Sequence, residues 1–141
     1  MNHFRVRPIG VIHSPYKTKE ETPRQGGKDV CEIEVFSEYE DGLQDIETFS
    51  HLHLFYWLHQ SSEHTLSVRT PWEETPHGLF ATRSPNRPNP LGYAVVCLLE
   101  RRRNVLRVHG VDAIDGTPVI DIKPYIPGVD ARPEATRGWL P

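Results

Sequence analysis

The sequence predicts an all-β protein with short helical turns, built as a single barrel or as a sandwich. About eight short segments show the alternation or the apolar runs of strands, and turn residues separate them. No segment shows the long helical periodicity that alternates with strands in βαβ proteins, so a Rossmann architecture is not expected. A closed barrel would also leave no exposed sheet edge.

The composition suits one soluble domain. The chain has 141 residues, of which 37% are hydrophobic and 25% charged. The sequence has no run of about 18 apolar residues, the length needed to cross a membrane. Residues 1–7 also lack the apolar core of a signal peptide, so we expect a cytoplasmic protein. Cys31 and Cys97 form no CxxC pair, which indicates free thiols in a reducing compartment.

The first third of the chain contains two predicted strands and a long loop. Residues 4–13 alternate loosely and predict a strand in which Pro8 must occupy an edge or a bulge. Residues 14–29 have no apolar period and predict an exposed loop, long enough to favour a functional role. Strict alternation over 30–36 predicts the second strand.

The centre of the chain is more apolar. Apolar residues spaced by three predict one or two helical turns over 39–49. Residues 51–59 are apolar or aromatic at most positions, which predicts a central strand buried on both faces.

Further strands are predicted over 66–70, 91–99, 105–111 and 119–122, and the apolar run 78–82 is also strand-like. A loop over 71–76, a hairpin turn at Arg103-Asn104 and a turn at Asp115-Gly116 separate them. We expect a barrel domain over residues 1–127 and a frayed tail, rich in Pro, Arg and Glu, over 128–141.

Residues 80–93 form a stiff loop with polar side chains. Its prolines, Pro85, Pro88 and Pro90, fix φ at about −65° and favour extended neighbours. Its polar residues Arg83, Arg87 and Asn89 can bind phosphates, carboxylates or base edges. The loop therefore predicts a binding wall, with a plain surface connection as the alternative.

The formal net charge of −3 argues against a general electrostatic binder of nucleic acid. Local basic patches remain possible at 101–103 with Arg107, or at Arg83 with Arg87. The alternative for the arginine triplet is a solvated turn between two strands.

Several common sites are absent from the sequence. It contains no GxxxxGK[ST], no GxGxxG and no GxSxG, and neither cysteine has a neighbouring base. His51 and His53 share one face of a strand, but His59 would lie about 26 Å from the first of them at the ~3.3 Å rise of a strand. We therefore expect no metal site.

Two polar segments remain as binding candidates. Residues 112–118 could hold ribose hydroxyls or an ammonium through their aspartates, although Asp115 before Gly116 could also be only a turn former. Pro23-Arg24-Gln25 can bind a carboxylate or a base edge, or could be an exposed loop without function.

Five segments together resemble one known family. They are 10–15 (GVIHSP), 23–25 (PRQ), 49–51 (FSH), 80–92 (FATRSPNRPNPLG) and 115–125 (DGTPVIDIKPY). In this order they resemble the YaeB/TrmO-like family of S-adenosylmethionine-dependent tRNA methyltransferases, over nearly the whole chain to about residue 127.

The resemblance implies a non-Rossmann β-barrel methyltransferase and a homodimer with the cofactor near the subunit interface. It implies methylation of N6 of threonylcarbamoyladenosine at position 37 of tRNA. Family members often carry a small aliphatic residue or Met where this chain has Tyr93. The implied cofactor contacts are Pro23, Arg24, Gln25, His59, Gln60, Arg83, Tyr93, Asp112, Ala113, Ile114 and Asp115.

Methyl transfer from a sulfonium is an in-line displacement that depends mainly on alignment of the reactants. The urea-like N6 is a poor nucleophile, so a base would help, and Asp115, Asp121 and His59 are open candidates. Arg24 or Arg83 could instead orient the substrate through its threonyl carboxylate. Two other hypotheses stay open: a methyltransferase for a small molecule, and a cofactor- or RNA-binding module without catalysis.

Overall fold

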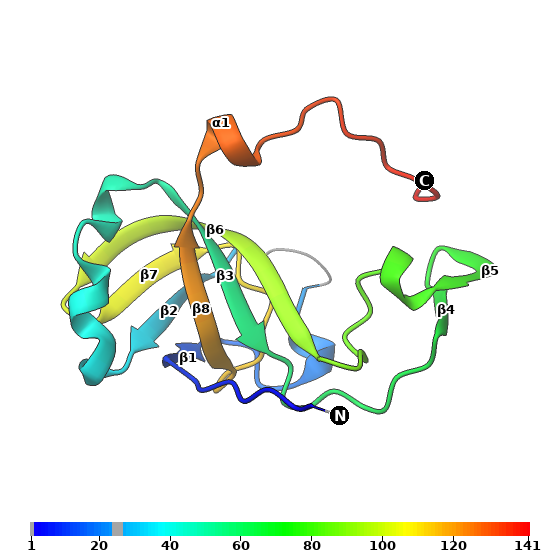
Figure 1. Ribbon diagram of the computed structural model, residues 1–141, viewed down its shortest axis with the longest axis horizontal. Coiled ribbons are helices and arrows are strands. Elements are labelled where there is room, and N and C mark those ends of the chain that lie inside the picture. Colours follow the sequence, from blue (N-terminus) through cyan, green and yellow to red (C-terminus); the bar gives the residue numbers. More distant parts are fainter. Residues whose placement is uncertain (1, 24–26) are drawn as a thin grey trace.

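The computed structural model, which describes residues 2–23 and 27–141, contains a closed antiparallel β-barrel (Figure 1). Its strand order is β1-β2-β7-β6-β3-β8. The strands are β1 (Gly10–His13), β2 (Val30–Val35), β7 (Val105–His109), β6 (Leu91–Arg102), β3 (His51–Trp57) and β8 (Pro118–Pro124). The predicted single barrel is confirmed, and the sandwich alternative is wrong.

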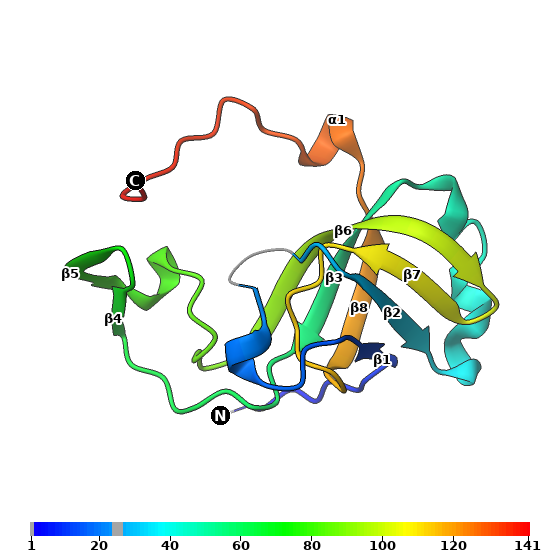
Figure 2. The same ribbon diagram turned by 180° about the vertical axis from the view of Figure 1, so that it is seen from behind.

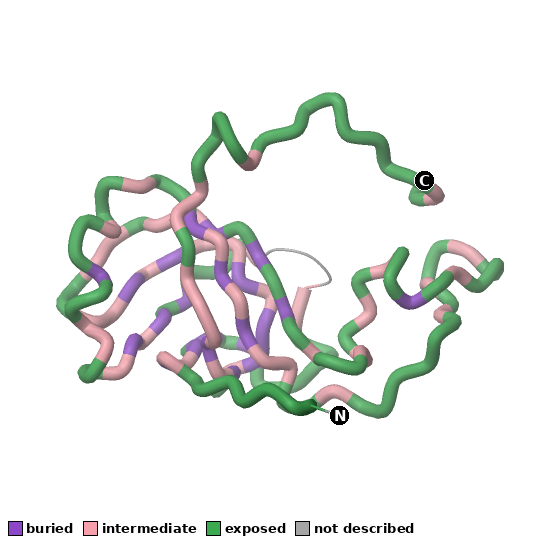
Figure 3. Tube along the Cα trace, in the orientation of Figure 1, coloured by how far each residue is buried: buried purple, intermediate pink, exposed green. Residues whose placement is uncertain are grey.

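The barrel interior is filled by alternate positions of each strand. On β3 the side chains of Leu52, Leu54 and Tyr56 are buried, while the positions between them face outward. Ile33 of β2 lies opposite Leu106 of β7, and both are fully buried. Figure 3 shows this concentration of buried residues in the barrel.

The outer face of β3 corrects one prediction. His51 is exposed, and the other outward residues of β3 are only partly buried, so the strand is not buried on both faces. A parallel sheet is covered by helices on both faces, whereas no helix of the described residues covers this wall. The run is apolar on both sides because its outer aromatic rings pack against neighbouring strands; Phe55, for example, lies 5.4 Å from the ring of Tyr93.

Three other predicted elements differ from the structure. The first strand begins only at Gly10, and residues 2–8 are exposed. The loop predicted over 71–76 is partly strand β5 (Glu73–Gly78), which pairs with β4 (Ser67–Thr70) in a separate hairpin. Pro76 is tolerated there because a two-stranded hairpin has only edge strands. The strand-like run 78–82 is instead the 3-10 turn η4 (Leu79–Ala81), in which the Thr82 amide donates to the Leu79 carbonyl and Leu79 is the buried residue.

Short helical turns complete the described fold. The helical turns predicted over 39–49 are confirmed as η2 (Ser37–Leu43) and η3 (Ile46–Thr48), and η1 (Lys19–Glu21) lies after β1. After β8, α1 (Pro127–Asp130) begins the tail, which passes toward the β4–β5 hairpin (Figure 2). No helix in the described part of the chain is both long and apolar enough for a membrane span.

The strand order places three long connections at one end of the barrel. Because neighbouring strands are antiparallel, the ends of β1, β3 and β7 and the starts of β2, β6 and β8 share one rim. The connections 14–29, 58–90 and 110–117 meet there, and we call this end the site rim (Figures 1 and 2). The opposite rim carries η2, η3 and the tight turn at Arg103, whose φ is 54°.

Candidate functional site

Nearly all the predicted cofactor contacts fall on the site rim. Pro23 lies in the first connection, His59, Gln60 and Arg83 in the second, and Asp112, Ala113, Ile114 and Asp115 in the third. Tyr93 is near the start of β6, beside this rim. Arg24 and Gln25 lie outside the described residues. The fold therefore gathers segments that are distant in sequence, although it does not by itself test the role of each residue.

Asp112 is tied to the barrel interior through Tyr56. The Tyr56 hydroxyl donates a hydrogen bond to Asp112 Oδ1. Tyr56 is 3% exposed, and burial together with the Asp112 carboxylate raises the pKa of its phenol. This contact fixes the start of the 112–115 segment relative to β3.

Gly92 makes room for Tyr56. The two residues are direct cross-strand partners, and a β-carbon at position 92 would overlap the Tyr56 ring. The glycine that ends the 80–92 motif is therefore required by packing. Sequence reasoning missed Tyr56; the available signal was a phenol at an inward position of β3, which needs a hydrogen-bond partner when buried.

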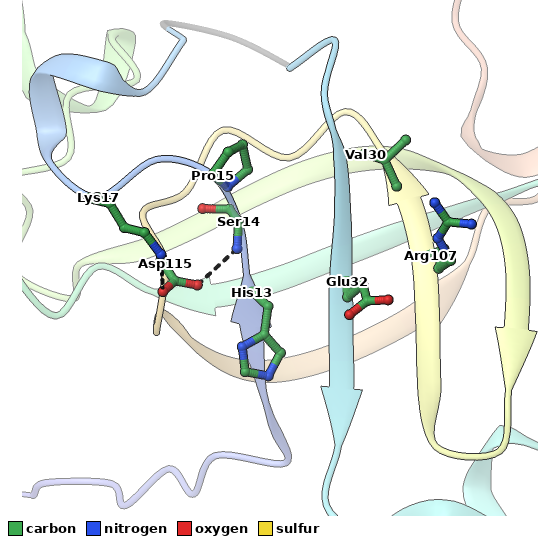
Figure 4. Close-up of a pocket in the computed structure, with 8 residues that line it drawn as sticks. All are labelled: His13, Ser14, Pro15, Lys17, Val30, Glu32, Arg107 and Asp115. Atoms are coloured by element: carbon green, nitrogen blue, oxygen red, sulfur yellow. Dashed lines mark hydrogen bonds and ion pairs between the residues drawn. The ribbon is translucent and has the colours of Figure 1, made fainter.

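Asp115 joins the third connection to the first. Its carboxylate accepts hydrogen bonds from the Ser14 amide at 3.0 Å and from Lys17 Nζ at 2.8 Å (Figure 4). The Lys17 bond, followed by the Ser14 amide, holds the pKa of Asp115 below its usual value. Ser14 Oγ in turn donates to the Ala113 carbonyl at 2.8 Å. The predicted turn is confirmed, with Gly116 at φ 87°, and the Asp115 carboxylate also anchors the adjoining loop.

An open cavity of about 530 Å³ lies beside this anchor on the outer side of β1 and β2 (Figure 4). Its lining residues are His13, Ser14, Pro15, Lys17, Val30, Glu32, Arg107 and Asp115. Of the predicted contacts that the structure describes, only Asp115 lines it, and its charged side chains are of both signs. The cavity therefore has no uniform field that would select an anion or a cation.

The residues that follow position 26 pack against the third connection. A β-carbon at Gly27 would overlap the Val111 carbonyl and would lie 2.7 Å from the Tyr16 hydroxyl. Tyr16 donates to Asp29 Oδ2 at 2.9 Å, and burial, then this bond, raises the pKa of Tyr16 to about 12. Gly27 therefore packs against Val111, the residue that precedes Asp112.

Arg83 is exposed at the site rim. No hydrogen bond to its guanidinium is found among residues 2–23 and 27–141. Burial raises the pKa of Tyr93, and the positive charge of Arg83 acts in the opposite direction. Arg83 and Tyr93 therefore lie near one another, and the Arg83 guanidinium is available to a ligand.

Arg87 braces the proline-rich loop. Its Nη1 donates to the carbonyls of Thr82 and Ser84, each at 3.0 Å, and its guanidinium lies 5.8 Å from the centre of the Phe80 ring. These contacts hold the backbone on both sides of Arg83. The loop is also joined to the end of β3, because the Leu58 amide donates to the Pro90 carbonyl at 2.7 Å.

The outer wall of β3 and β6 carries a polar cluster that sequence reasoning missed. His53 Nδ1 lies 2.9 Å from the Tyr93 hydroxyl, and His53 Nε2 lies 2.9 Å from Asp130 Oδ2. The His53 bond, then the Ile126 amide, lowers the pKa of Asp130. Asp121 lies on this wall opposite Phe55, at the level of Tyr93, and pairs with Lys123 at 3.4 Å.

A closed antiparallel barrel with three long connections at one rim is a fold class distinct from the dinucleotide-binding α/β folds. Residues 11–131 match the family model described as "tRNA-methyltransferase O N-terminal domain", so this chain belongs to that family. The resemblance seen in the sequence is thereby confirmed.

Curated relatives agree with this assignment. The chain is 53% identical over 138 residues to a probable S-adenosyl-L-methionine-binding protein of Archaeoglobus fulgidus, covering 96% of this chain and 38% of the relative. It is 50% identical to a probable S-adenosyl-L-methionine-binding protein of Pyrococcus abyssi, covering 95% of this chain and 74% of that one. It is 38% identical to the tRNA (adenine(37)-N6)-methyltransferase of Escherichia coli, covering 99% of this chain and 65% of that enzyme.

Solved structures show the same barrel. A crystal structure of TrmO matches with a TM-score of 0.82 at 37% identity, covering 100% of this chain and 65% of that one. TrmO from Pseudomonas aeruginosa matches with a TM-score of 0.80 at 34% identity, covering 100% of this chain and 64% of that one. The chain thus spans about two thirds of these proteins and a smaller share of the Archaeoglobus relative, at 38%.

Proposed function

We propose that this protein binds S-adenosylmethionine at the site rim and transfers its methyl group to tRNA. The observation that carries the proposal is the convergence of the 58–60, 83–93 and 112–115 segments, with Pro23 and Gly27, at one end of the barrel. Family membership and the names of the relatives support it.

The described residues fit such a cofactor. Carboxylates such as that of Asp112 accept hydrogen bonds from ribose hydroxyls, and an exposed guanidinium such as that of Arg83 binds carboxylates. When bound, S-adenosylmethionine supplies an electrophilic methyl group on a sulfonium. The chain contributes orientation, because Gly92, Tyr56 and Asp112 form a rigid connection between three elements.

We further propose that the substrate is N6-threonylcarbamoyladenosine at position 37 of tRNA. The urea-like N6 needs a proton acceptor. Of the three candidates, Asp115 is engaged by Ser14 and Lys17, and Asp121 is paired with Lys123. His59 is exposed on the rim, and no side-chain hydrogen bond to it is found in the described part of the chain, so it is favoured as the proton acceptor.

A homodimer is also proposed, with the site near the subunit interface. The outer wall of β6 exposes large apolar side chains at alternate positions, with Leu91 at 44%, Tyr93 at 43% and Val95 at 39%. A row of this kind suits contact with a second copy of the chain. Because Tyr93 also borders the rim, such a contact would cover the edge of the site. Sedimentation measures the stoichiometry.

Incubation with methyl-labelled S-adenosylmethionine and two tRNA pools tests the proposed reaction. One pool carries the threonylcarbamoyl modification, and the other is the matched pool from cells that lack it. We expect label only in the modified pool, since only its N6 carries the urea-like group and a carboxylate for Arg83.

The other outcomes select the alternatives. Cofactor binding without label in either pool favours a methyltransferase for a small molecule. Retention of RNA without cofactor binding favours a binding module without catalysis. Equal label in both pools would contradict the proposed nucleoside while leaving tRNA methylation in place.

A further inference from the structure

The β4–β5 hairpin has little support of its own. It forms a separate two-stranded sheet beside the barrel, and all of its residues are exposed or only partly buried (Figure 3). An isolated two-stranded hairpin is at best marginally stable in water. The η4 turn follows β5 directly and ends two residues before Arg83. Whatever orders the hairpin therefore also affects the start of the proline-rich loop.

The C-terminal tail contacts this hairpin through Trp139. The Trp139 ring stacks on His77 of β5, with centroids 3.8 Å apart and planes inclined by 12°. Trp139 Nε1 donates to the Ala81 carbonyl of η4 at 2.8 Å. The Trp72 ring also stacks on the Trp139 ring, with centroids 6.4 Å apart. His77 is itself held by Glu73, with Nε2 2.5 Å from Oε1. The tail predicted to fray is instead attached at this residue.

The other end of the tail is attached to the barrel. Asp130 bonds His53 of β3 and the Ile126 amide, and His53 bonds the Tyr93 hydroxyl. Between these two attachments the tail is exposed, and it spans from the barrel wall to the hairpin (Figures 1 and 2). Each attachment therefore adjoins a predicted cofactor contact, Tyr93 at one end and Arg83 at the other.

We propose that residues 127–141 form a strap between the barrel and the hairpin, and that Trp139 is a positioning residue for Arg83. The Ala81 carbonyl and the His77 ring are the two groups it holds. A stacked ring with one hydrogen bond restricts both translation and rotation of η4 relative to the tail. The positioning role rests on the proposed S-adenosylmethionine site, whereas the strap itself does not.

Two measurements on Trp139→Ala test the strap. We expect amide hydrogen exchange over residues 67–82 to become about tenfold faster, with exchange in the barrel strands unchanged. We expect the KM for S-adenosylmethionine to rise about tenfold while kcat changes by less than about twofold, since the strap acts on binding geometry. Trp139→Phe keeps the ring and loses the N–H donor, so it should recover part of both effects.

The matched control is Glu134→Ala, an exposed tail residue whose side chain makes no hydrogen bond or ion pair with the described residues. It should leave exchange and KM unchanged. Unchanged exchange over 67–82 in Trp139→Ala would overturn the strap, and a loosened hairpin with an unchanged KM would overturn the positioning role. If the wild-type protein binds no S-adenosylmethionine, the proposed function and the positioning role both fail, while exchange still decides the strap.

Discussion

Replacing Arg83 with alanine is expected to abolish methyl transfer to tRNA, by at least about a hundredfold, while the barrel stays folded. Arg83 is exposed on the rim and braces nothing among the described residues, so its loss costs little stability. Its planar guanidinium suits a carboxylate of the cofactor or of the threonyl group. Labelled transfer to modified tRNA measures the activity, and urea unfolding measures the stability.

Arg102→Ala is the matched control. Arg102 is an exposed arginine at the opposite rim, and within residues 2–23 and 27–141 its side chain pairs only with Glu100. Its replacement should leave activity unchanged. Full activity in Arg83→Ala would contradict the assignment of the proline-rich loop as a wall of the site. Lysine at position 83 should recover little of the lost rate, because it cannot form a bidentate contact.

Gly92→Ala is expected to lower the free energy of unfolding by about 1–3 kcal/mol, and to reduce activity more than stability alone explains. The new methyl group would overlap the Tyr56 ring, which is locked in the core and holds Asp112. Displacement of the ring would therefore disturb the 112–115 segment. Urea unfolding, with activity assayed well below the unfolding transition, separates the two effects.

The double variant Gly92→Ala with Tyr56→Leu identifies the cause. A smaller residue at position 56 relieves the overlap, so the double variant should be more stable than the sum of the single changes predicts. Its activity should stay low, since leucine cannot bond Asp112. Gly42→Ala is the control, because a β-carbon there meets nothing within 4 Å. Additive changes in stability would contradict the packing role of Gly92.

Local patterns predicted the barrel strands well. Alternation predicted β2 and β7 closely because each has one face in the core and one in solvent. The same reasoning failed for β3, where outer aromatic residues imitate a strand buried on both sides. It also failed for β5, which pairs with the adjacent β4 although it contains Pro76 and Gly78, residues that local propensity assigns to turns.

Individual roles in the site were harder to predict than its location. The resemblance pointed to segments that the strand order does bring to one rim. It gave no sign of the Tyr56–Asp112 bond, of the anchoring of Asp115 by Lys17, or of the Trp139 contact. Each joins residues at least 56 positions apart in the sequence, and no local spacing encodes such a pair.

Titration calorimetry with S-adenosylmethionine tests the central claim most directly. The protein is used as purified, with a chelator and no added metal, and its folding is verified by thermal unfolding in the same buffer. We predict saturable binding at one cofactor per chain, weakened in Arg83→Ala and unchanged in Arg102→Ala. Absence of binding heat at several temperatures by the folded wild-type protein would contradict the assignment of the rim as a cofactor site.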